Sequence, residues 1–346
     1  MILRPFLDAL ISETQQSFPP GPGGPAPLIL DYRFDEPMAA HTTFKVGGPA
    51  DLWLRPGGEL FSLFTGLLLS RAGEAGFPVF ILGGGANLVV SDRGIRGIVL
   101  DTGDWTGIEQ EAGGLYVKSG TSIDEITEYA ARQGLSGLEF LAGLPGTLGG
   151  AVWMNARCYE KSVSDILGET EILVVNGKTA ERRRVSRYPG DFSYKRSPFQ
   201  GQDKLILGAR LSVSRGDPEK IRREMTEYRE DRERKGHYRY PSAGSVFKNN
   251  RDFGSSTGQI IEELGLRGLH LGGARIAPWH GNIIINTGNA GAADIRSLAD
   301  LVAARAKAER GLELEREILF VGDWEETGAE SPAEKRNIDN ETRGNL

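Results

Sequence analysis

Several features that define other protein classes are scarce or missing in this sequence of 346 residues. It contains a single cysteine, Cys158, so no internal disulfide can form and a reducing, cytoplasmic setting is expected. The four histidines are scattered and no CxxC or HExxH spacing occurs, so we expect no metal site. No run reaches the ~18 apolar residues of a membrane span. The N-terminal stretch MILRPFLDALISE lacks the long apolar core of a secretory signal.

The chain also lacks an excess of positive charge. Its formal net charge is -6, which argues against a general nucleic-acid binder because such proteins usually carry a basic face. A small basic pocket for phosphates remains compatible with this charge. The apolar and charged fractions, 39% and 25%, are ordinary for a folded protein, and the length suffices for two or three domains.

Composition divides the chain into four parts. Residues 1–17 could form an amphipathic helix, and residues 18–27 (FPPGPGGPAP) cannot hold a helix or a central strand, because proline removes donors and glycine adds entropy. The sequence from residue 323 is polar and has little to bury. We therefore predict an N-terminal extension and linker (1–30), a first module (31–216), a second module (217–322) and a polar tail (323–346).

Hydrophobic periodicity and capping signals predict an α+β protein. A capping serine at Ser122, followed by Glu125, predicts the start of one helix. The predicted strands are 51–54, 79–82, 98–100, 115–117, 171–175, 205–213, 283–286 and 317–321, and the predicted helices are 59–75, 123–133, 218–235, 258–264 and 292–309.

Two glycine-rich segments are candidate ligand sites. In residues 81–92 (ILGGGANLVVSD) an apolar strand runs into three glycines, which allow backbone N–H groups to approach a phosphate. The residues that follow favour a strand over a helix, so the segment is a poor dinucleotide-binding fingerprint of the βαβ type. Residues 143–155 (GLPGTLGGAVWMN) are suited to packing backbone against a flat ligand. For both segments a tight turn without a ligand is the alternative.

Together these segments resemble the UDP-N-acetylenolpyruvoylglucosamine reductase family. The resemblance covers about residues 40–322 and rests on seven motifs in the same order. They are 43–48 (TFKVGG), 81–92, 137–155, 192–199 (FSYKRSPF), 240–249 (YPSAGSVFKN), 258–268 (GQIIEELGLRG) and 314–322 (LEREILFVG). The resemblance implies a vanillyl-alcohol-oxidase-type (PCMH-type) FAD-binding module of two α+β subdomains, followed by a C-terminal α+β substrate-binding domain.

The resemblance also implies an activity. NADPH reduces FAD, and the flavin then reduces UDP-N-acetylglucosamine enolpyruvate to UDP-N-acetylmuramate for peptidoglycan synthesis. FAD is expected to be non-covalent, because residues 81–92 contain no histidine or cysteine that could tether it. That absence disfavours a sugar oxidase on the same fold. The other rival is a sugar-nucleotide-binding protein that has lost catalysis.

Three residues are implied to be catalytic. Ser245 matches the family's proton-donating serine, and a serine that only closes a turn is the alternative. Glu317 matches the family's glutamate near the C-terminus, where apolar neighbours predict partial burial; an exposed strand glutamate is the alternative. The family's arginine is replaced by Lys195, which keeps the charge but loses the bidentate grip on a carboxylate. If the segment is extended, Lys195 and Arg196 face opposite sides and register favours Lys195.

The remaining implied site residues divide by ligand. Lys235, Lys248 and Asn249 could hold the UDP diphosphate or sugar, or form a solvated basic edge. Arg157, Cys158 and Glu160 depart from the family's small residues beside the expected flavin. The implied FAD-binding residues are Gly83, Gly84, Gly85, Ala86, Asn87, Gly146, Gly149 and Gly150, and the implied substrate-binding residues are Tyr194, Arg196, Lys235, Lys248, Asn249 and Glu262.

Overall fold

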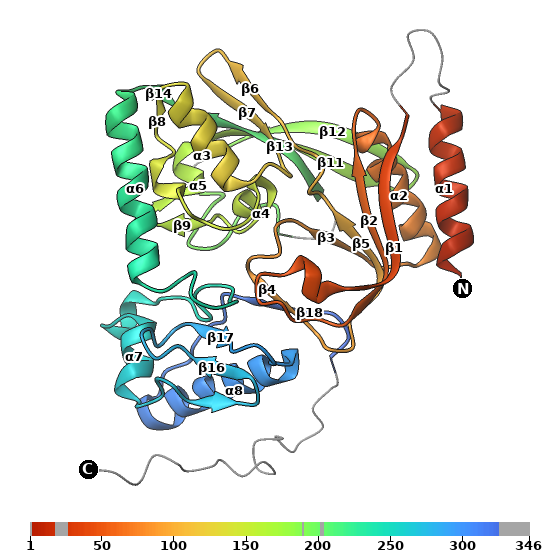
Figure 1. Cartoon of the computed structure of the whole chain (residues 1–346). Helices are drawn as coiled ribbons and strands as arrows, with labels where there is room; N and C mark the ends of the chain where they lie inside the picture. Colours follow the sequence, from red (N-terminus) through yellow and green to blue (C-terminus); the bar gives the residue numbers. More distant parts are fainter. Residues whose placement is uncertain (1, 18–26, 189, 201–203, 325–346) are drawn as a thin grey trace.

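The computed structural model describes residues 2–17, 27–188, 190–200 and 204–324. These residues form two α+β subdomains and a C-terminal domain, which occupies the lower part of Figure 1. The predicted linker and most of the predicted tail lie outside the described residues. Among the residues described, no helix is both long enough and apolar enough to cross a membrane.

The first subdomain is a four-stranded sheet in the order β1-β2-β5-β3, and β2, β5 and β3 run parallel. Its apolar face packs on α2, which also contacts the second sheet through Leu173. Sequence patterns indicated each of the helices and strands given below except β1, and β4 confirms the strand tendency of the residues after the glycines. β1 was missed although Leu30, Tyr32 and Phe34 alternate with charged residues along it. The elements are α1 (Leu3–Ser17), β1 (Ile29–Pro37), β2 (Pro49–Gly57), α2 (Phe61–Ala75), β3 (Val79–Leu82), β4 (Leu88–Val90) and β5 (Ile95–Asp101).

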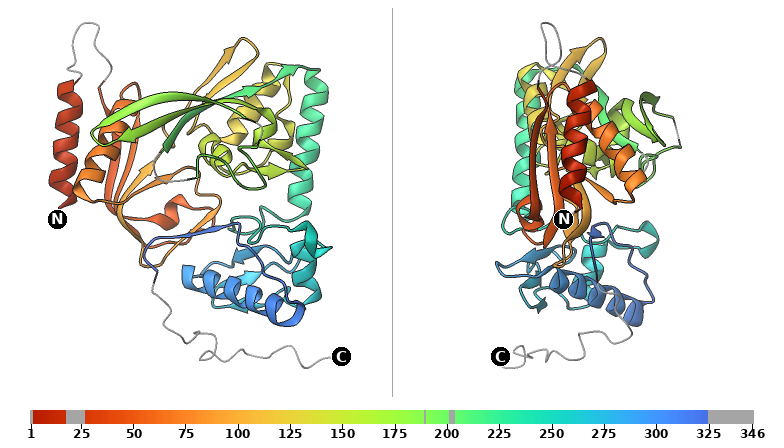
Figure 2. Two further views of the ribbon diagram at one scale, coloured as in Figure 1. Left: turned by 180° about the vertical axis from the view of Figure 1, so that it is seen from behind. Right: turned by 90° about the vertical axis from the view of Figure 1, so that its right-hand side faces the viewer.

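Helix α1 is part of the first subdomain's packing. Leu7 and Leu10 are buried in the same core as α2, and Arg71 of α2 binds Glu13 of α1 at 2.6 Å. Figure 2 shows α1 beside α2 on the outer side of the molecule. Residues 1–17, which composition assigned to an extension, therefore contribute to the folded core.

The second subdomain is an antiparallel sheet in the order β12-β11-β13-β7-β6. The serine cap predicted for α3 is present, since Ser122 Oγ accepts the backbone N–H of Glu125 at 3.1 Å. β12 was not predicted because it is an exposed, arginine-rich edge strand. The elements are β6 (Ile108–Glu111), β7 (Gly114–Lys118), α3 (Ile123–Arg132), β8 (Leu135–Ser136), α4 (Leu148–Trp153), β9 (Arg157–Cys158), β10 (Lys161–Ser162), α5 (Val163–Ile166), β11 (Leu167–Asn176), β12 (Thr179–Ser186), β13 (Lys204–Ser212) and β14 (Ser214–Arg215).

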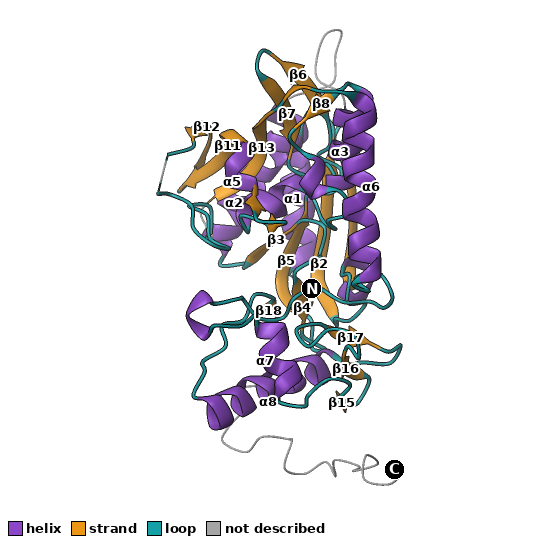
Figure 3. Cartoon of the chain, turned by 90° about the vertical axis from the view of Figure 1, so that its left-hand side faces the viewer, coloured by secondary structure: helices purple, strands orange, loops and turns teal. Residues whose placement is uncertain are grey.

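Helix α6 (Pro218–Arg234) runs along one side of the second subdomain (Figure 3). Ile221 and Met225 pack on Ala131 and Ala142 of that subdomain. The boundary predicted at residue 217 falls before this helix, but the packing places α6 with the residues before it.

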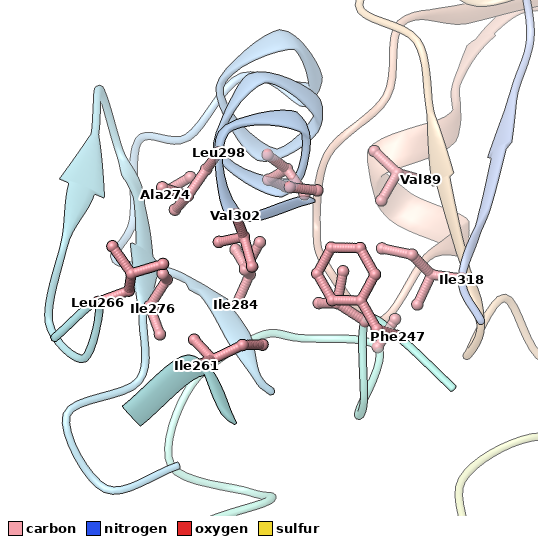
Figure 4. Close-up of a cluster of buried hydrophobic side chains, with 14 of the residues drawn as sticks. Val89, Phe247, Ile261, Leu266, Ala274, Ile276, Ile284, Leu298, Val302 and Ile318 are labelled. Carbon is pink, nitrogen blue, oxygen red and sulfur yellow. The ribbon is translucent and has the colours of Figure 1, made fainter. Parts of the chain in front are cut away.

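The C-terminal domain packs α8 on a three-stranded antiparallel sheet in the order β15-β16-β17. Its core includes Phe247 and Ile318, and Val89 from the first subdomain enters the same cluster (Figure 4). β18 returns to the first subdomain and pairs in parallel with β4. The predicted closing strand began at Glu317, whereas β18 begins at Leu319. The elements are α7 (Thr257–Glu263), β15 (His270–Leu271), β16 (Ala274–Ile276), β17 (Ile284–Asn286), α8 (Ala292–Arg310) and β18 (Leu319–Val321).

Candidate active site

One large cavity, of about 1200 Å³, lies where the two subdomains and the C-terminal domain meet. It has the size and the mixed apolar and polar lining typical of a cofactor site. It brings together both glycine-rich segments, the 193–196 turn, the start of the 245–249 segment and Glu317. The predicted residues that line it are Gly83, Gly84, Gly85, Ala86, Asn87, Gly146, Gly149, Gly150, Lys195, Lys235, Ser245, Asn249 and Glu317.

The two glycine segments lie directly against each other. A Cβ added at Gly84 would lie 2.6 Å from the Cα of Gly146, and one at Gly83 would lie 2.8 Å from Oγ1 of Thr147. Gly85 has φ +61°, and a Cβ there would lie 2.0 Å from the carbonyl oxygen of His41. Gly84 and Gly85 require glycine because neighbouring backbone occupies the space of a side chain, whereas at Gly83 the hydroxyl of Thr147 occupies it. The loop therefore presents bare backbone to the cavity.

Two buried hydroxyls on the cavity wall lack a partner within the described residues. They are Oγ of Ser119 and Oγ1 of Thr147. Buried hydroxyls are normally hydrogen-bonded, so this pair fits a ligand rich in acceptors, such as the diphosphate of FAD. Sequence reasoning missed both residues, although Thr147 lies inside the glycine-rich segment that was singled out.

Lys195 and Glu317 form an ion pair inside the cavity, with 2.7 Å between Nζ and Oε1. Their side chains are 11% and 12% exposed, so water screens the pair only weakly. The predicted partial burial of Glu317 is confirmed. No sequence pattern paired it with Lys195, which is more than a hundred residues away.

The segment around Lys195 is a tight turn, and not the extended segment that the choice between Lys195 and Arg196 took as its condition. Ser193 and Arg196 exchange two backbone hydrogen bonds, at 3.0 and 3.2 Å, and Lys195 has φ +58°. This left-handed conformation is uncommon for a residue with a Cβ. The turn directs Lys195 into the cavity, while Arg196 is 66% exposed and lies 3.7 Å from Glu315. The side chains of Lys195 and Arg196 point in different directions, as expected, but a turn and not an extended strand separates them.

The position of Ser245 is set by hydrogen bonds between the two residues that follow it, Val246 and Phe247, and Asn282. Ser245 forms an antiparallel bridge with Ile283, and the buried side chain of Asn282 binds both backbone groups of Phe247. Oδ1 of Asn282 accepts the N–H of Phe247 at 2.9 Å, and Nδ2 of Asn282 donates to the carbonyl of Phe247 at 2.7 Å. Asn282 is a residue that sequence reasoning missed, because a lone asparagine before a strand carries no distinctive signal.

Glu317 is fixed on two sides. Its backbone N–H donates to the carbonyl of Val246 at 2.8 Å. Glu317 is therefore paired with the residue that follows Ser245 in the chain. Its carbonyl accepts from Nδ2 of Asn87 at 3.1 Å. Asn87 thereby joins the end of the first glycine segment to Glu317.

The wall next to α6 is aromatic and basic. Nζ of Lys235 lies 2.6 Å from Oδ2 of Asp231, which also accepts from the hydroxyl of Tyr159 at 3.0 Å. Burial, with the positive charge of Arg232 beside it, lowers the pKa of His237 to about 4. Burial also lowers the pKa of His280, against the opposing influence of Glu262. Neutral imidazoles therefore face this part of the cavity near pH 7.

Cys158, one of the departures from the family pattern, also lines the cavity, with Arg157 and Glu160. Its Sγ donates to the carbonyl of Phe140 at 3.0 Å. Burial raises the pKa of the thiol, so it stays protonated near pH 7.

Four predicted substrate residues lie outside the cavity lining. Tyr194 is 37% exposed at the tip of the turn, and Arg196 points outward beside it. Lys248 binds Glu315 at 2.6 Å. Glu262 accepts from the N–H of Gly281 at 3.1 Å. Their proposed contacts with substrate stay predictions.

Comparison with known proteins agrees with this arrangement. The profile of the UDP-N-acetylenolpyruvoylglucosamine reductase C-terminal domain matches residues 236–321, and that of an FAD binding domain matches residues 67–182. The chain is 39% identical to the UDP-N-acetylenolpyruvoylglucosamine reductase of Treponema denticola, over 84% of this chain and 94% of that protein. It is 40% identical to that of Borreliella burgdorferi, over 82% and 93%.

The chain belongs to the UDP-N-acetylenolpyruvoylglucosamine reductase family. A solved structure of the Thermus caldophilus member has a TM-score of 0.69 and 33% identity, and the match covers 85% of this chain and all of that one. The predicted fold, the FAD cofactor and the oxidoreductase class are confirmed. Family membership also accounts for the seven ordered motifs.

Proposed function

We propose that the protein reduces UDP-N-acetylglucosamine enolpyruvate to UDP-N-acetylmuramate, with NADPH as electron donor and non-covalently bound FAD. The observation that carries the proposal is the Lys195–Glu317 ion pair in the cavity that both glycine segments line. A cation, a carboxylate and a serine hydroxyl are the groups that this reaction needs beside a flavin.

The FAD would lie against the backbone of residues 83–87 and 146–150, and Ser119 and Thr147 would donate to its phosphate oxygens. When bound, the flavin supplies the hydride that NADPH provides. Gly83, Gly84 and Gly85 keep the approach free of side chains. Ser119 and Thr147 would each gain a hydrogen-bond partner that the described residues do not provide.

Lys195 would stabilise the charge that develops on the substrate carboxylate as the enolpyruvyl group accepts a hydride. Its ammonium already lies against Glu317 at 2.7 Å, so a positive charge is held in place before the substrate arrives. A substrate carboxylate would compete with Glu317 for this ammonium. Glu317 would then be free to relay a proton.

Ser245 would donate a proton to the neighbouring substrate carbon. A serine hydroxyl is a very weak acid, but the enolate-like intermediate is a strong carbon base, so a weak acid suffices. Ser245 is adjacent in the chain to Val246, whose carbonyl accepts the N–H of Glu317. Proton donor and carboxylate are thus held by one backbone arrangement.

The first experiment measures NADPH oxidation with and without UDP-N-acetylglucosamine enolpyruvate. Oxidation that depends on the substrate supports the proposal, and flavin reduction by NADPH without reoxidation by substrate contradicts it. Parallel runs with NADH determine the donor. An oxidase would instead consume oxygen with a sugar substrate.

A stopped-flow experiment on Ser245→Ala separates the two half-reactions. Flavin reduction by NADPH should proceed at the parental rate, since this step needs no proton from Ser245. Reoxidation by substrate should slow about 100-fold or more, the usual contribution of a general acid. Equal slowing of both steps would assign Ser245 to flavin positioning.

A further inference from the structure

Arg232 differs from the other basic residues at the C-terminal end of α6. Arg229 binds Glu128 at 2.7 Å, Lys235 binds Asp231 at 2.6 Å and Arg234 lies 3.5 Å from Asp231. Within the described part of the chain, no carboxylate lies within ion-pair distance of Arg232. Its charge is therefore the one in this group without a carboxylate beside it.

Arg232 is nevertheless buried. The residue is 8% exposed, and its Nε has no hydrogen-bond partner among the described residues. The guanidinium lies 5.9 Å from the ring of Tyr159, and its positive charge acts on the thiol of Cys158. A thiol is a weak acceptor and an aromatic ring is a weak counter-charge. Neither replaces a carboxylate.

The side chain of Arg232 lines the large cavity, one helical turn before Lys235. Its charge influences the groups around it, since it contributes to the lowered pKa of His237. A buried cation with no partner is costly and persists in proteins when an anion completes its coordination. The cavity is the side from which that anion can come.

We propose that Arg232 binds an anionic oxygen of a ligand in this cavity, and that it carries more of this binding than Lys235. The oxygen belongs either to a phosphate of the sugar nucleotide or to FAD. The inference rests on the proposed function for the identity of these ligands. The choice over Lys235 follows from charge, because Asp231 already neutralises that ammonium, while Nε of Arg232 has no partner and no carboxylate pairs with its guanidinium among the described residues.

The test compares Arg232→Met with Arg229→Met. The control removes a guanidinium three residues earlier on the same helix, from a side chain that is 37% exposed and paired with Glu128. Two affinities are measured: that of FAD for the deflavinated full-length chain, by flavin fluorescence, and that of UDP-N-acetylglucosamine for the holoenzyme, by flavin absorbance. Neither measurement requires turnover, so failure of the proposed reaction would not be confused with failure of this inference.

Arg232→Met should weaken one of the two affinities at least tenfold, and Arg229→Met should change both less than twofold. Loss of UDP-N-acetylglucosamine affinity identifies the sugar nucleotide as the source of the anion, and loss of FAD affinity identifies the cofactor. Both affinities within twofold of the parent in Arg232→Met would overturn the proposal. If that variant does not fold, Arg232→Lys is used: it keeps the charge but loses the fork of donors, so a threefold or greater loss of one affinity is expected. Unchanged affinities in Arg232→Lys would then count against the proposal.

Discussion

At the scale of single residues, Lys195, at the position where the resemblance implies an arginine, is the feature with the clearest consequence. The side chain is confined to a left-handed turn, enters the cavity and pairs with Glu317. Arg196, its neighbour, is exposed and close to Glu315. A lysine at this point offers a compact charge in place of a planar fork.

We predict that Lys195→Ala slows flavin reoxidation by substrate about 30- to 1000-fold, as expected for the loss of about 2–4 kcal/mol of transition-state stabilisation. Arg196→Ala should be mild, and Lys195→Arg should retain substantial activity. The measurement is single-turnover reoxidation of the three variants at saturating substrate. A severe defect in Arg196→Ala with a near-normal Lys195→Ala would move the catalytic cation one residue along.

A second residue-scale prediction concerns Asn282, which we interpret as a positioning residue for Ser245. Asn282→Ala leaves the buried N–H and carbonyl of Phe247 without partners, which should lower the free energy of unfolding by about 2–4 kcal/mol. Under conditions where the variant is folded, kcat should fall more than KM rises. Urea unfolding and steady-state kinetics measure the two effects.

The exposed Asn289 supplies the control for this prediction. Asn289→Ala should change stability by less than about 0.5 kcal/mol. Asn282→Asp adds a finer comparison, because a carboxylate accepts from the N–H of Phe247 but cannot donate to its carbonyl. If Asn282→Ala lost stability and kept full kcat, its role would be structural only.

At the scale of elements, the glycine segment after β3 is defined by what it packs against. The nearest atoms to a Cβ at Gly84 belong to the backbone of the second glycine segment, which cannot rotate away as a side chain could. The two segments come from different subdomains. Their spacing therefore also sets the relative position of these subdomains along the cavity.

We predict that Gly84→Val weakens FAD affinity at least tenfold and destabilises the fold by about 1–3 kcal/mol, the usual range for overpacking. Gly73→Ala in α2 is the control, because a Cβ at that position meets nothing within 4 Å. That substitution should stabilise the chain by about 0.5–1 kcal/mol through helix propensity. FAD titration and urea unfolding test both. Unaltered FAD affinity in Gly84→Val would show that the loop does not contact the cofactor.

At the scale of the whole molecule, a histidine with a strongly lowered pKa lies where the two subdomains and the C-terminal domain meet. His237 has its pKa lowered to about 4 because burial and the nearby Arg232 disfavour its charged form. The unfolded chain binds a proton near the ordinary value of about 6.5, so it takes up more protons than the folded chain between these two values. Stability contributed by neutral His237 is therefore present above pH ~6.5 and is lost as the pH falls towards 4.

We predict that the parent protein loses more stability between pH 7.5 and pH 5 than His237→Gln does, by about 1–2 kcal/mol after allowance for partial exposure. Urea unfolding at the two pH values measures the difference. The lowered pKa of Asp231 adds to acid sensitivity only at lower pH, since an ordinary aspartate titrates near 4. Parallel pH dependence in the parent and in His237→Gln would exclude His237 as the source.

Sequence alone determined the elements and the family. Strong periodicity and capping predicted α3, α6 and α8 to within one or two residues, and β3 at its observed bounds. Glycine content marked both segments of the cavity wall, because close backbone approach needs residues without a side chain. Motif order predicted Ser245, Glu317 and Lys195 as site residues. The edge strand β12 was missed because its exposed residues do not alternate between apolar and polar. The edge strand β1 was missed although Leu30, Tyr32 and Phe34 alternate with charged residues.

Only the tertiary structure decided which of these residues meet. Contacts between segments far apart in the chain produce the Lys195–Glu317 pair and the hydrogen bonds of Asn282 to Phe247. They also bury Arg232, with no carboxylate beside it among the residues that the structure describes. A periodic pattern records whether a residue faces a core, but not which partner it finds there. The turn at Lys195 was missed for the same reason: its left-handed backbone carries no glycine, and the surrounding fold imposes it.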